Sequence, residues 1–508
     1  MTTKPAASHL LLSTPRRPPP PPPTSRLLLH LSFFLLHLHC FTSALPHQLS
    51  RGFSAHPSSN PPPPLSSSSS LSFQPILDDP TGNFSLGFLL LPSPPALLHL
   101  AVVHLPSALP VWRAAPAASA RWSDSASLSF NGSLIFSDRT GAVLWSAGGS
   151  PAGDRLVLLN SSNLQIQKLS GSIVWQSFDS PFDTLVQGQN LTSSATLFSA
   201  DRRYSMRLGT NYVALYMAAG TNTVMYWQVT ALEERAEIVK GAGPIYARVD
   251  PLGFLGLYQN ETARVHVMAF DTFNRGIPGF RRLTLETDGN LRAYYWNAYS
   301  WVPDFTAISD VCELPAHCGA YGVCTMAKGD CGCLDEDRTG DGCLPSDAGN
   351  LCGGKFWELR RTGVELPYKD LLVSQKVGSR EECESGCQRN CSCWGALYNN
   401  ATGNCYRMDF PVETLLATGD RHRVGYFKVR NARSGKEGKK EPLVGLVAVL
   451  VVGLPVFAGV AMFGAYRMWE YRRRAGGALM EEGISPGSYK EFKNSSSFRE
   501  IELSGSGR

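Results

Sequence analysis

The sequence predicts a mainly β, multidomain extracellular protein that a single helix anchors in a membrane. Three observations carry this prediction. Short apolar runs alternate with polar turn residues from about residue 73 to residue 308, twelve of the thirteen cysteines lie between Cys312 and Cys405, and an uncharged apolar run extends from Leu443 to Tyr466. Two-residue alternation indicates strands, clustered cysteines indicate an oxidising compartment, and the run is long enough to span a bilayer.

Composition narrows the function classes. The 508-residue chain has a formal net charge of +5, and 18% of its residues are charged. That share is below the ~25% usual in globular proteins, and so small a net charge for this length predicts no nucleic-acid partner. The length allows roughly three or four domains.

The N-terminus has the outline of a secretory signal peptide, assigned to residues 1–44. Arginines precede an apolar core at 27–41, and small residues follow up to Ala44, where a signal peptidase would cut. Histidines interrupt the core and a proline run precedes it, so a disordered leader with a misassigned start codon is the alternative. Cleavage after Ala44 would remove Cys40 and leave twelve cysteines, an even number.

The apolar run 443–466 predicts the transmembrane helix. At ~1.5 Å per residue it is long enough for the ~30 Å hydrocarbon core of a bilayer. A buried core helix is the alternative, but residues 467–508 offer nothing to cover it. Basic residues flank both ends of the run, so the signal peptide and the cysteines decide the orientation instead of the charges. The sequence thus predicts a single-pass type I plasma-membrane protein with an extracellular N-terminal part and a cytoplasmic tail.

Two segments are predicted to be linkers. Residues 45–72 are rich in proline and serine, and such a composition buries too little apolar surface to fold. Residues 431–442 separate the last predicted strand from the apolar run.

The strand-rich region contains a repeated unit of about 30 residues. Polar turns followed by strands begin at Asn131 and Ser162, and these units end soon after in Trp145 and Trp175. Short, evenly spaced strands are typical of a β-sandwich, barrel or prism, and the tryptophan repeat favours a threefold β-prism. No helix of convincing length is predicted before residue 379.

Longer strings in this region resemble a known family. The strings Gly82–Phe88, Leu144–Ser146 and Trp175–Leu185, with Trp112, resemble the bulb-type (G-type) lectin domain of plant S-domain receptors. Arg282–Trp296 resembles the S-locus glycoprotein segment, a second lectin-like prism. The resemblance covers about residues 73 to 430 and is closest to the plant PAN domain-containing proteins that lack a kinase. Together with the segments above it implies this order: signal peptide 1–44, linker 45–72, bulb-type lectin domain 73–192, S-locus glycoprotein or second lectin-like domain 193–309, EGF-like module 310–344, PAN/apple α+β module 352–430, juxtamembrane linker 431–442, transmembrane helix 443–466 and cytoplasmic tail 467–508.

The first six cysteines resemble the EGF-like module of this family. Cys318-Gly-Ala-Tyr-Gly-Val-Cys324 matches its signature closely. Spacing alone allows 15 connectivities. Calcium-binding EGF modules have acidic and amide residues before the first cysteine, and only Asp310 is present here, so no calcium, other metal or cofactor is expected. The resemblance implies the pairs Cys312–Cys324, Cys318–Cys331 and Cys333–Cys343.

The second six cysteines resemble the PAN/apple module, a helix stapled to a sheet. Ser379-Arg-Glu-Glu382 is a capping box that predicts a helix start, and Cys383 and Cys387 then lie one turn apart on one face. A zinc cluster is the alternative use of such closely spaced thiols, and an oxidising compartment argues against it. The resemblance implies the pairs Cys383–Cys405, Cys387–Cys393 and Cys352–Cys391.

Two kinds of short motif predict modification and trafficking. In the tail, Tyr489 and Phe492 form the pattern of a tyrosine, two residues and a bulky apolar residue, a candidate sorting motif for clathrin adaptors; an uninvolved tail is the alternative. Sequons of the form Asn-x-Ser/Thr predict N-glycans on exposed loops of the extracellular part. These sequons lie at Asn83, Asn131, Asn160, Asn190, Asn260, Asn390 and Asn400.

The resemblance also implies where a sugar would bind. Bulb lectins hold mannose with the strand motif Gln-x-Asp-x-Asn-x-Val-x-Tyr, whose polar side chains bind hydroxyls and whose valine packs on the sugar ring. Two aligned strands have lost most of the hydrogen-bonding set and contain Ser129, Asn131, Ser133, Ile135 and Ser137, and Leu159, Ser161, Asn163, Gln165 and Gln167. The third has Arg292 in place of the valine and keeps the candidate carbohydrate-binding residues Glu286, Asp288, Asn290 and Tyr294. An ordinary polar β-turn is the alternative.

No catalytic constellation emerges from the sequence. The histidines are scattered, the cysteines are expected to be paired, and residues 467–508 are too few for a kinase domain and lack its motifs. The chain is therefore predicted not to be an enzyme. The resemblance implies a receptor-like glycoprotein that recognises an extracellular peptide or glycan and signals through a co-receptor kinase, with homo- or heterodimerisation open. A cell-wall or adhesion lectin without a signalling role is the alternative.

Overall fold

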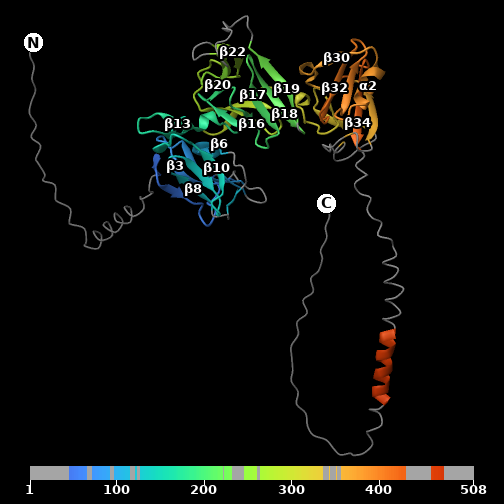
Figure 1. The fold of residues 1–508 in the computed structure, drawn as a ribbon, viewed down its shortest axis with the longest axis horizontal. Helices are drawn as coiled ribbons and strands as arrows, with labels where there is room; N and C mark the ends of the chain where they lie inside the picture. Colours follow the sequence, from blue (N-terminus) through green and yellow to red (C-terminus); the bar gives the residue numbers. More distant parts are fainter. Residues whose placement is uncertain are drawn as a thin grey trace, which may run out of the picture. The chain divides into compact units, whose positions relative to one another are not determined.

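The protein is described by a computed structural model (Figure 1), in which the chain divides into two compact units, Met1–Asn431 and Ala432–Arg508. The described residues are 45–65, 71–91, 97–114, 120–122, 126–220, 222–231, 245–259, 264–335, 343, 351, 356–430 and 459–473. Outside them lie the predicted signal peptide 1–44, the juxtamembrane linker 431–442, most of the apolar run 443–466, Asn260, Cys352, Tyr489 and Phe492.

The first unit begins with three antiparallel sheets. Burial alternates as the sequence predicts along β8 (Ser127–Phe130), where Leu128 and Phe130 are buried, and along β9 (Leu134–Ser137), where Leu134 and Phe136 are buried. The first sheet contains β3 (Ser72–Asp78), β4 (Phe84–Leu91), β5 (Leu97–His104) and β6 (Leu109–Arg113), with β7 (Ala120–Arg121) beside β5; the second contains β2 (Phe53–Ala55), β8 (Ser127–Phe130), β9 (Leu134–Ser137) and β10 (Val143–Ala147); the third contains β1 (Gln48–Ser50), β11 (Arg155–Leu158), β12 (Leu164–Gln167) and β13 (Ile173–Gln176).

Three tryptophans join these sheets at the centre. Trp112, Trp145 and Trp175 lie on the last strands of the three sheets, β6, β10 and β13. Their ring centroids are 5.7, 5.8 and 6.0 Å apart, and every pair packs edge to face. Such pairs prefer this geometry because the positive ring edge meets the negative ring face. The repeated tryptophan in the sequence is therefore one contribution from each sheet to a common core.

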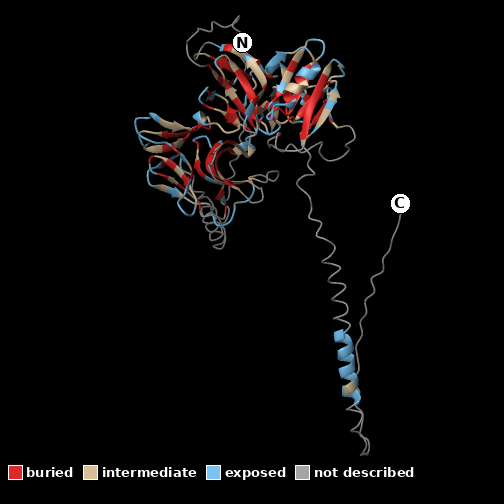
Figure 2. Ribbon diagram, turned by 45° about the vertical axis from the view of Figure 1, so that its right-hand side comes forward, coloured by how far each residue is buried: buried red, intermediate tan, exposed pale blue. Residues whose placement is uncertain are grey.

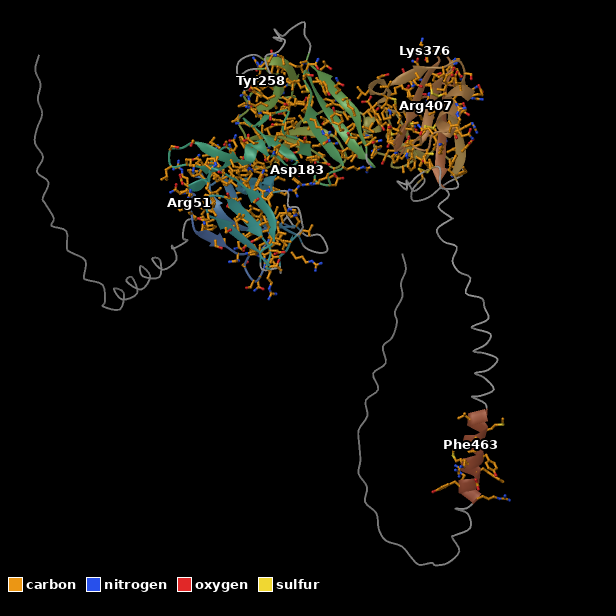
Figure 3. All side chains as sticks on the ribbon, in the orientation of Figure 1. Arg51, Asp183, Tyr258, Lys376, Arg407 and Phe463 are labelled. Carbon is orange, nitrogen blue, oxygen red and sulfur yellow. A yellow bond between two sulfur atoms is a disulfide. The ribbon has the colours of Figure 1, made fainter. Side chains whose placement is uncertain are left out.

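The prediction that residues 45–72 form a linker is wrong for the first part of this segment. Residues of β1 pair with β11, and residues of β2 pair with β8, so these two strands complete two of the three sheets. Leu49 is only 3% exposed, and Arg51 between the strands binds Asp154 at 2.8 Å (Figure 3). The prolines and serines that follow dominate the average composition of the segment, and three-residue strands give too little alternation to stand out against them.

A second group of three four-stranded antiparallel sheets repeats this topology. Each group starts with three short strands that become the edges of three different sheets, and three hairpin-connected strands then complete each sheet in turn. The sheets contain β16 (Leu197–Phe198), β17 (Tyr204–Leu208), β18 (Tyr212–Ala219) and β19 (Asn222–Thr230); β15 (Asn190–Leu191), β20 (Tyr246–Asp250), β21 (Phe254–Tyr258) and β22 (Arg264–Ala269); and β14 (Thr184–Val186), β23 (Arg281–Leu285), β24 (Leu291–Trp296) and β25 (Trp301–Thr306).

This topology moves the boundary expected between residues 192 and 193. Strands β14 and β15 pair with β23 and β20, so they belong to the second group. The boundary falls between the end of β13 and the start of β14, at residues 177–183. The family-like string that ends at Leu185 spans this boundary, which is why the sequence placed it too late. We call the first group the N-terminal domain, residues 45–176, and the second the middle domain, residues 184–309.

The cysteine-rich region forms two more sheets. One is mixed, because β26 and β33 run parallel, so the segments expected to form separate EGF-like and PAN modules share one sheet. This sheet contains β27 (Asp330–Cys333), β26 (Gly322–Thr325), β33 (Thr414–Ala417) and β29 (Val364–Glu365), and the other contains β28 (Phe356–Thr362), β34 (Arg423–Arg430), β31 (Gly395–Asn399), β32 (Asn404–Met408) and β30 (Ser374–Lys376). Short 3-10 turns lie at η1 (Leu105–Ser107), η2 (Ser177–Asp179), η3 (Val311–Glu313) and η4 (Lys369–Leu371).

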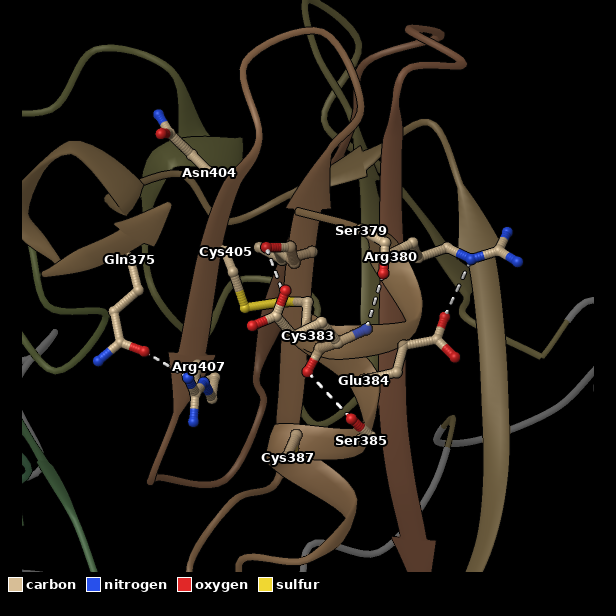
Figure 4. Close-up of a disulfide and its surroundings, with 12 residues drawn as sticks. Gln375, Ser379, Arg380, Cys383, Glu384, Ser385, Cys387, Asn404, Cys405 and Arg407 are labelled. Carbon is tan, nitrogen blue, oxygen red and sulfur yellow. Dashed lines mark hydrogen bonds and ion pairs between the residues drawn. A yellow bond between two sulfur atoms is a disulfide. The ribbon is translucent and has the colours of Figure 1, made fainter. Parts of the chain in front are cut away.

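Helix α2 (Arg380–Gln388) starts where the capping box predicts. Ser379 Oγ accepts a hydrogen bond from the backbone N–H of Glu382 at 3.2 Å, which satisfies one of the free N–H groups of the first turn. The Glu382 carboxylate reaches back to the N–H of Gly378 at 2.9 Å. The buried side chains of the helix are Cys383 and Cys387, so its packing depends on disulfides instead of an aliphatic face (Figure 4).

Two main cores result (Figure 2). The N-terminal domain has its own core around the three tryptophans. A second, continuous core extends from Leu185 in the middle domain to Val429 on β34 and includes Tyr321 and Leu415 of the mixed sheet. The middle domain and the cysteine-rich region therefore share one core.

In the second unit, residues 459–473 form a helix. Among the residues that the structure describes, no helix is long and apolar enough to cross a membrane.

We predict that Leu49→Ala destabilises the N-terminal domain by ~2–5 kcal/mol, because it removes a buried side chain from a sheet edge and leaves a cavity. Gln48→Ala, at the exposed neighbouring position of β1, is the matched control and should change stability little. Urea unfolding of the two variants measures the difference. Equal stability would show that residues 48–50 are a linker after all.

Candidate ligand-binding sites

The three segments aligned with the mannose motif occupy equivalent places in the fold. They are the hairpin turns β8–β9, β11–β12 and β23–β24. Each turn contains one residue in the left-handed region: Gly132 with φ 93°, Ser162 with φ 71° and Gly289 with φ 87°. The polar residues around them are the types that a tight turn favours. An ordinary polar β-turn is the alternative to sugar binding given above.

In the third hairpin the candidate carbohydrate-binding residues are hydrogen-bonded to groups of the protein itself. The Asp288 carboxylate accepts two hydrogen bonds from the Arg292 guanidinium, at 3.0 and 2.6 Å. Tyr294 Oη donates to Glu286 Oε1 at 2.9 Å. The arginine that replaces the motif's valine therefore engages the carboxylate that would otherwise accept hydrogen bonds from a sugar.

The charges and protonation states in this hairpin stabilise the hydrogen bonds just described. Burial raises the pKa of Asp288, but hydrogen bonds from Arg292 and the backbone of Asn290 outweigh it and leave the pKa lowered. Burial, with the nearby Glu286, raises the pKa of Tyr294 to about 12, so its hydroxyl stays protonated and donates at neutral pH. The Arg282 guanidinium lies 4.1 Å from the centroid of the Tyr294 ring and fixes that ring in place.

Asn290 has an architectural role. Its side chain is buried, its Nδ2 donates to the carbonyl of Ile308 at 2.7 Å, and its Oδ1 accepts from the N–H of Ile308 at 3.1 Å. Asn163, at the same place in the β11–β12 hairpin, accepts from the N–H of Phe178 at 3.4 Å. Both asparagines thus tie a hairpin turn to the chain that leaves the last strand of the same sheet.

A buried ion pair within one sheet of the middle domain binds a residue that follows a strand of another sheet. Arg281 on β23 and Asp304 on β25 are 1% and 0% exposed, and the guanidinium donates to the carboxylate. Thr272, after β22, donates its N–H and its hydroxyl to the same carboxylate at 2.9 and 2.7 Å. Every polar atom of the pair that faces the core is in this way bound, so these charges are structural.

The cysteines are joined in the pairs that the resemblance implies wherever both partners are described. Cys391 is also disulfide-bonded, and its expected partner Cys352 lies outside the described residues. The grouping of His317 with Cys318, Cys324 and Cys331 has donor atoms close enough for a metal, but its sulfurs belong to disulfides and cannot act as thiolate ligands. The described pairs are Cys312–Cys324, Cys318–Cys331, Cys333–Cys343, Cys383–Cys405 and Cys387–Cys393.

The Asp310 carboxylate, two residues before Cys312, caps the 3-10 turn η3. It accepts from the N–H of Cys312 at 2.9 Å. The sequon asparagines that the structure describes are all exposed, as glycosylation requires. They are Asn83, Asn131, Asn160, Asn190, Asn390 and Asn400.

An aromatic cluster that the sequence did not indicate joins the N-terminal and middle domains. His104 lies within 5.3 to 5.7 Å of Phe84, Phe280, Trp296 and Trp301, measured between ring centroids. Burial lowers the pKa of His104 to about 4, so the ring is neutral at physiological pH. Its Nδ1 is 2.7 Å from Ser107 Oγ.

Comparison with known proteins identifies the domains. A model of the D-mannose binding lectin domain matches residues 110–207, the S-locus glycoprotein domain matches residues 256–336, and the PAN domain matches residues 359–428. A PAN domain-containing protein of Arabidopsis thaliana is 39% identical over 464 residues, which are 90% of this chain and 92% of that protein. The chain belongs to this family of PAN domain-containing proteins.

The other relatives of this PAN domain-containing protein share part of their length with it. A G-type lectin S-receptor-like serine/threonine-protein kinase, also of Arabidopsis thaliana, is 24% identical over 78% of this chain and 50% of the kinase. EP1-like glycoprotein 4 of the same plant is 24% identical over 61% of this chain and 76% of that glycoprotein. The chain is thus a lectin-like S-domain protein related to receptor kinases, and it spans about half the length of this kinase.

We predict that Asn290→Ala destabilises the middle domain, because it leaves the buried N–H and carbonyl of Ile308 without partners, at ~1–3 kcal/mol for each group. Asp288→Ala removes a partly exposed ion pair and the hydrogen bond from the N–H of Asn290, and should cost less, about 1–2 kcal/mol. Thermal unfolding of both variants tests this difference. If the two variants are equally stable, Asn290 has no architectural role.

We predict that the N-terminal domain loses stability as the pH falls from 6.5 toward 4. In the folded state the pKa of His104 is about 4, below the ordinary 6.5. The stabilisation that the neutral ring gives is therefore complete above pH 6.5 and is lost as the pH falls from 6.5 to 4. His104→Phe keeps an aromatic ring in the cluster and should reduce the acid sensitivity of the melting temperature. The same change at exposed His47 is the control, and an unchanged pH profile in His104→Phe would contradict the assignment.

Proposed function

We propose that this PAN domain-containing protein is a single-pass receptor-like glycoprotein of the plasma membrane. Its extracellular part recognises a peptide or glycan ligand, and the signal passes through a partner kinase. We further propose that the two three-sheet domains are tandem β-prisms, followed by an EGF-like and a PAN module and by a transmembrane helix at 443–466. The lectin, S-locus glycoprotein and PAN domains that the chain shares with S-receptor-like kinases support this architecture.

The observation that carries the proposal is that the polar side chains of the third hairpin, β23–β24, are hydrogen-bonded within the protein. Arg292 binds both oxygens of Asp288, Asn290 binds Ile308, and Tyr294 donates to Glu286. All four candidate carbohydrate-binding residues therefore already have partners within the protein. The first two hairpins lack most of the motif. A monosaccharide site depends on a few hydrogen bonds worth ~1 kcal/mol each, and millimolar binding corresponds to only ~4 kcal/mol, so losing two or three partners abolishes binding. The bulb-lectin mannose site is therefore not the ligand site we propose.

The shared core supports a receptor role in which the middle domain and the cysteine-rich region act together. Residues 185 to 429 share buried apolar side chains and a mixed sheet. A ligand that contacts one part of this core would therefore affect the packing of the rest of it. A cell-wall or adhesion lectin remains the second candidate, because the fold is that of a lectin and the sequons predict a glycoprotein.

We predict that calorimetry of the intact protein in detergent shows no binding of mannose at millimolar concentration, because the candidate ligands are engaged within the protein. Arg292→Val restores the residue type of the mannose motif and releases the Asp288 carboxylate, so it is the variant in which binding would appear first. Saturable mannose binding by the unaltered protein, lost in Asp288→Ala, would support the lectin instead.

The proposal that the protein signals through a partner kinase is tested by purifying the intact protein from plant membranes. A receptor kinase should co-purify with the full chain and be absent when the chain is truncated after residue 430. A glycan array probed with the same truncated form separates the two candidates, since strong and specific glycan binding without an associated kinase would favour the adhesion lectin.

A further inference from the structure

A cleft of about 440 Å³ lies where the N-terminal and middle domains meet. Phe84 and His104 line it from the N-terminal domain, and Phe280 and Trp296 line it from the middle domain. This volume is within the ~300–1,000 Å³ of pockets that hold small molecules or single sugar units. The cleft is separate from the three hairpins aligned with the mannose motif, except that one rim belongs to the β11–β12 turn through Asn160.

The walls of the cleft suit an uncharged ring with one apolar face. Phe84 and Phe280 are 5.1 Å apart between ring centroids, and His104 lies over Phe280 at 5.5 Å in a stacked arrangement. No lysine, arginine, aspartate or glutamate is among the described residues that line it. The C–H face of a pyranose ring packs on such aromatic surfaces because apolar area is removed from water.

One polar atom in the cleft lacks a partner. Gln187 Oε1 is buried and accepts no hydrogen bond from any described residue. A buried acceptor in this state indicates a missing donor, since buried polar groups are nearly always hydrogen-bonded. An N-acetyl N–H group or a sugar hydroxyl would supply that donor.

Two sequon asparagines, Asn83 and Asn160, also line the cleft. Asn83 Nδ2 donates to Thr81 Oγ1 at 3.0 Å. The exposed side chain of Asn160 makes no hydrogen bond within the described part of the chain. The Asn160 amide is therefore the freer of the two to carry a glycan toward the aromatic walls.

We propose that the N-glycan on Asn160 folds back into this cleft, where its first N-acetylglucosamine packs on the aromatic walls and donates a hydrogen bond to Gln187. In the secretory pathway Asn160 Nδ2 bonds to the anomeric carbon of a lipid-pyrophosphate-linked oligosaccharide, the amide loses one proton, and the lipid pyrophosphate leaves. The glycan then contacts both domains and stabilises their arrangement.

The test compares the Asn160 glycan with the glycan on Asn400, an exposed sequon in the β31–β32 turn. The full chain is produced in plant cells with mannosidases inhibited, so that every glycan can be cut between its first two N-acetylglucosamine residues by an endoglycosidase. Glycopeptide mass spectrometry follows cleavage at each site under native conditions. We expect cleavage at Asn160 at least tenfold slower than at Asn400, and equal rates after reduction and denaturation.

Two variants connect the protection to the cleft. Trp296→Ala removes an aromatic wall and Gln187→Ala removes the acceptor, and each should bring cleavage at Asn160 to within about twofold of Asn400. Unchanged cleavage at Asn400 and an intact disulfide map verify that the variants fold. An unoccupied Asn160, native cleavage as fast as at Asn400, protection of Asn83 instead, or protection unchanged in both folded variants would overturn the proposal. Release of a bound small molecule from the Asn160→Gln protein on denaturation would identify the cleft as a ligand site instead.

Discussion

Both three-sheet domains depend on the way in which their first three strands are distributed over three different sheets. β1, β2 and β3 each pair with a different sheet of the N-terminal domain, and β14, β15 and β16 do the same in the middle domain. Without them the strands that they pair with would lose their backbone hydrogen-bond partners on one side, and buried groups without such partners are costly. The first three strands of each domain therefore contribute to all three of its sheets.

Most of the polar chemistry of this protein serves that architecture. Asn163 and Asn290 tie equivalent turns to the chain that leaves the last strand of each sheet. The buried pair of Arg281 and Asp304 lies within one sheet of the middle domain and binds Thr272, which follows a strand of another. A buried ion pair contributes little when it is compared with apolar packing, but removing one partner costs ~3–5 kcal/mol because a charge is left alone in the core. Residue types that suit sugar binding are thus used for contacts inside the protein in the β23–β24 hairpin.

The cysteine-rich region is coupled to the middle domain by more than its disulfides. The parallel pairing of β26 and β33 brings residues about ninety positions apart into one sheet, and the continuous core places Tyr321 beside side chains of β34. Tyr321 Oη donates to the carbonyl of Lys428 at 2.7 Å, a contact that links the segment with the first cysteines directly to the PAN segment. The N-terminal domain, by contrast, has its own core, which Val186 of the middle domain joins, and it meets the middle domain through the aromatic cluster around His104. Arg113 also binds Asp183 of the connecting segment at 2.6 Å.

The sequence by itself determined the features that are local in the chain. The alternation along β8 and β9, the tryptophan repeat, the capping box of α2 and the family strings all depend on neighbouring residues, so the mainly β class, the helix start and the domain types could be read directly. Tertiary structure decided what depends on distant partners. The short strands β1, β2, β14 and β15 carry too little pattern to be recognised without the sheets that they complete, so a linker and a domain boundary were misplaced. Only where separate segments meet does Asn290 bind Ile308 and does the aromatic cleft form beside Gln187. The reason is that the availability of a side chain for a ligand depends on the groups that fold against it.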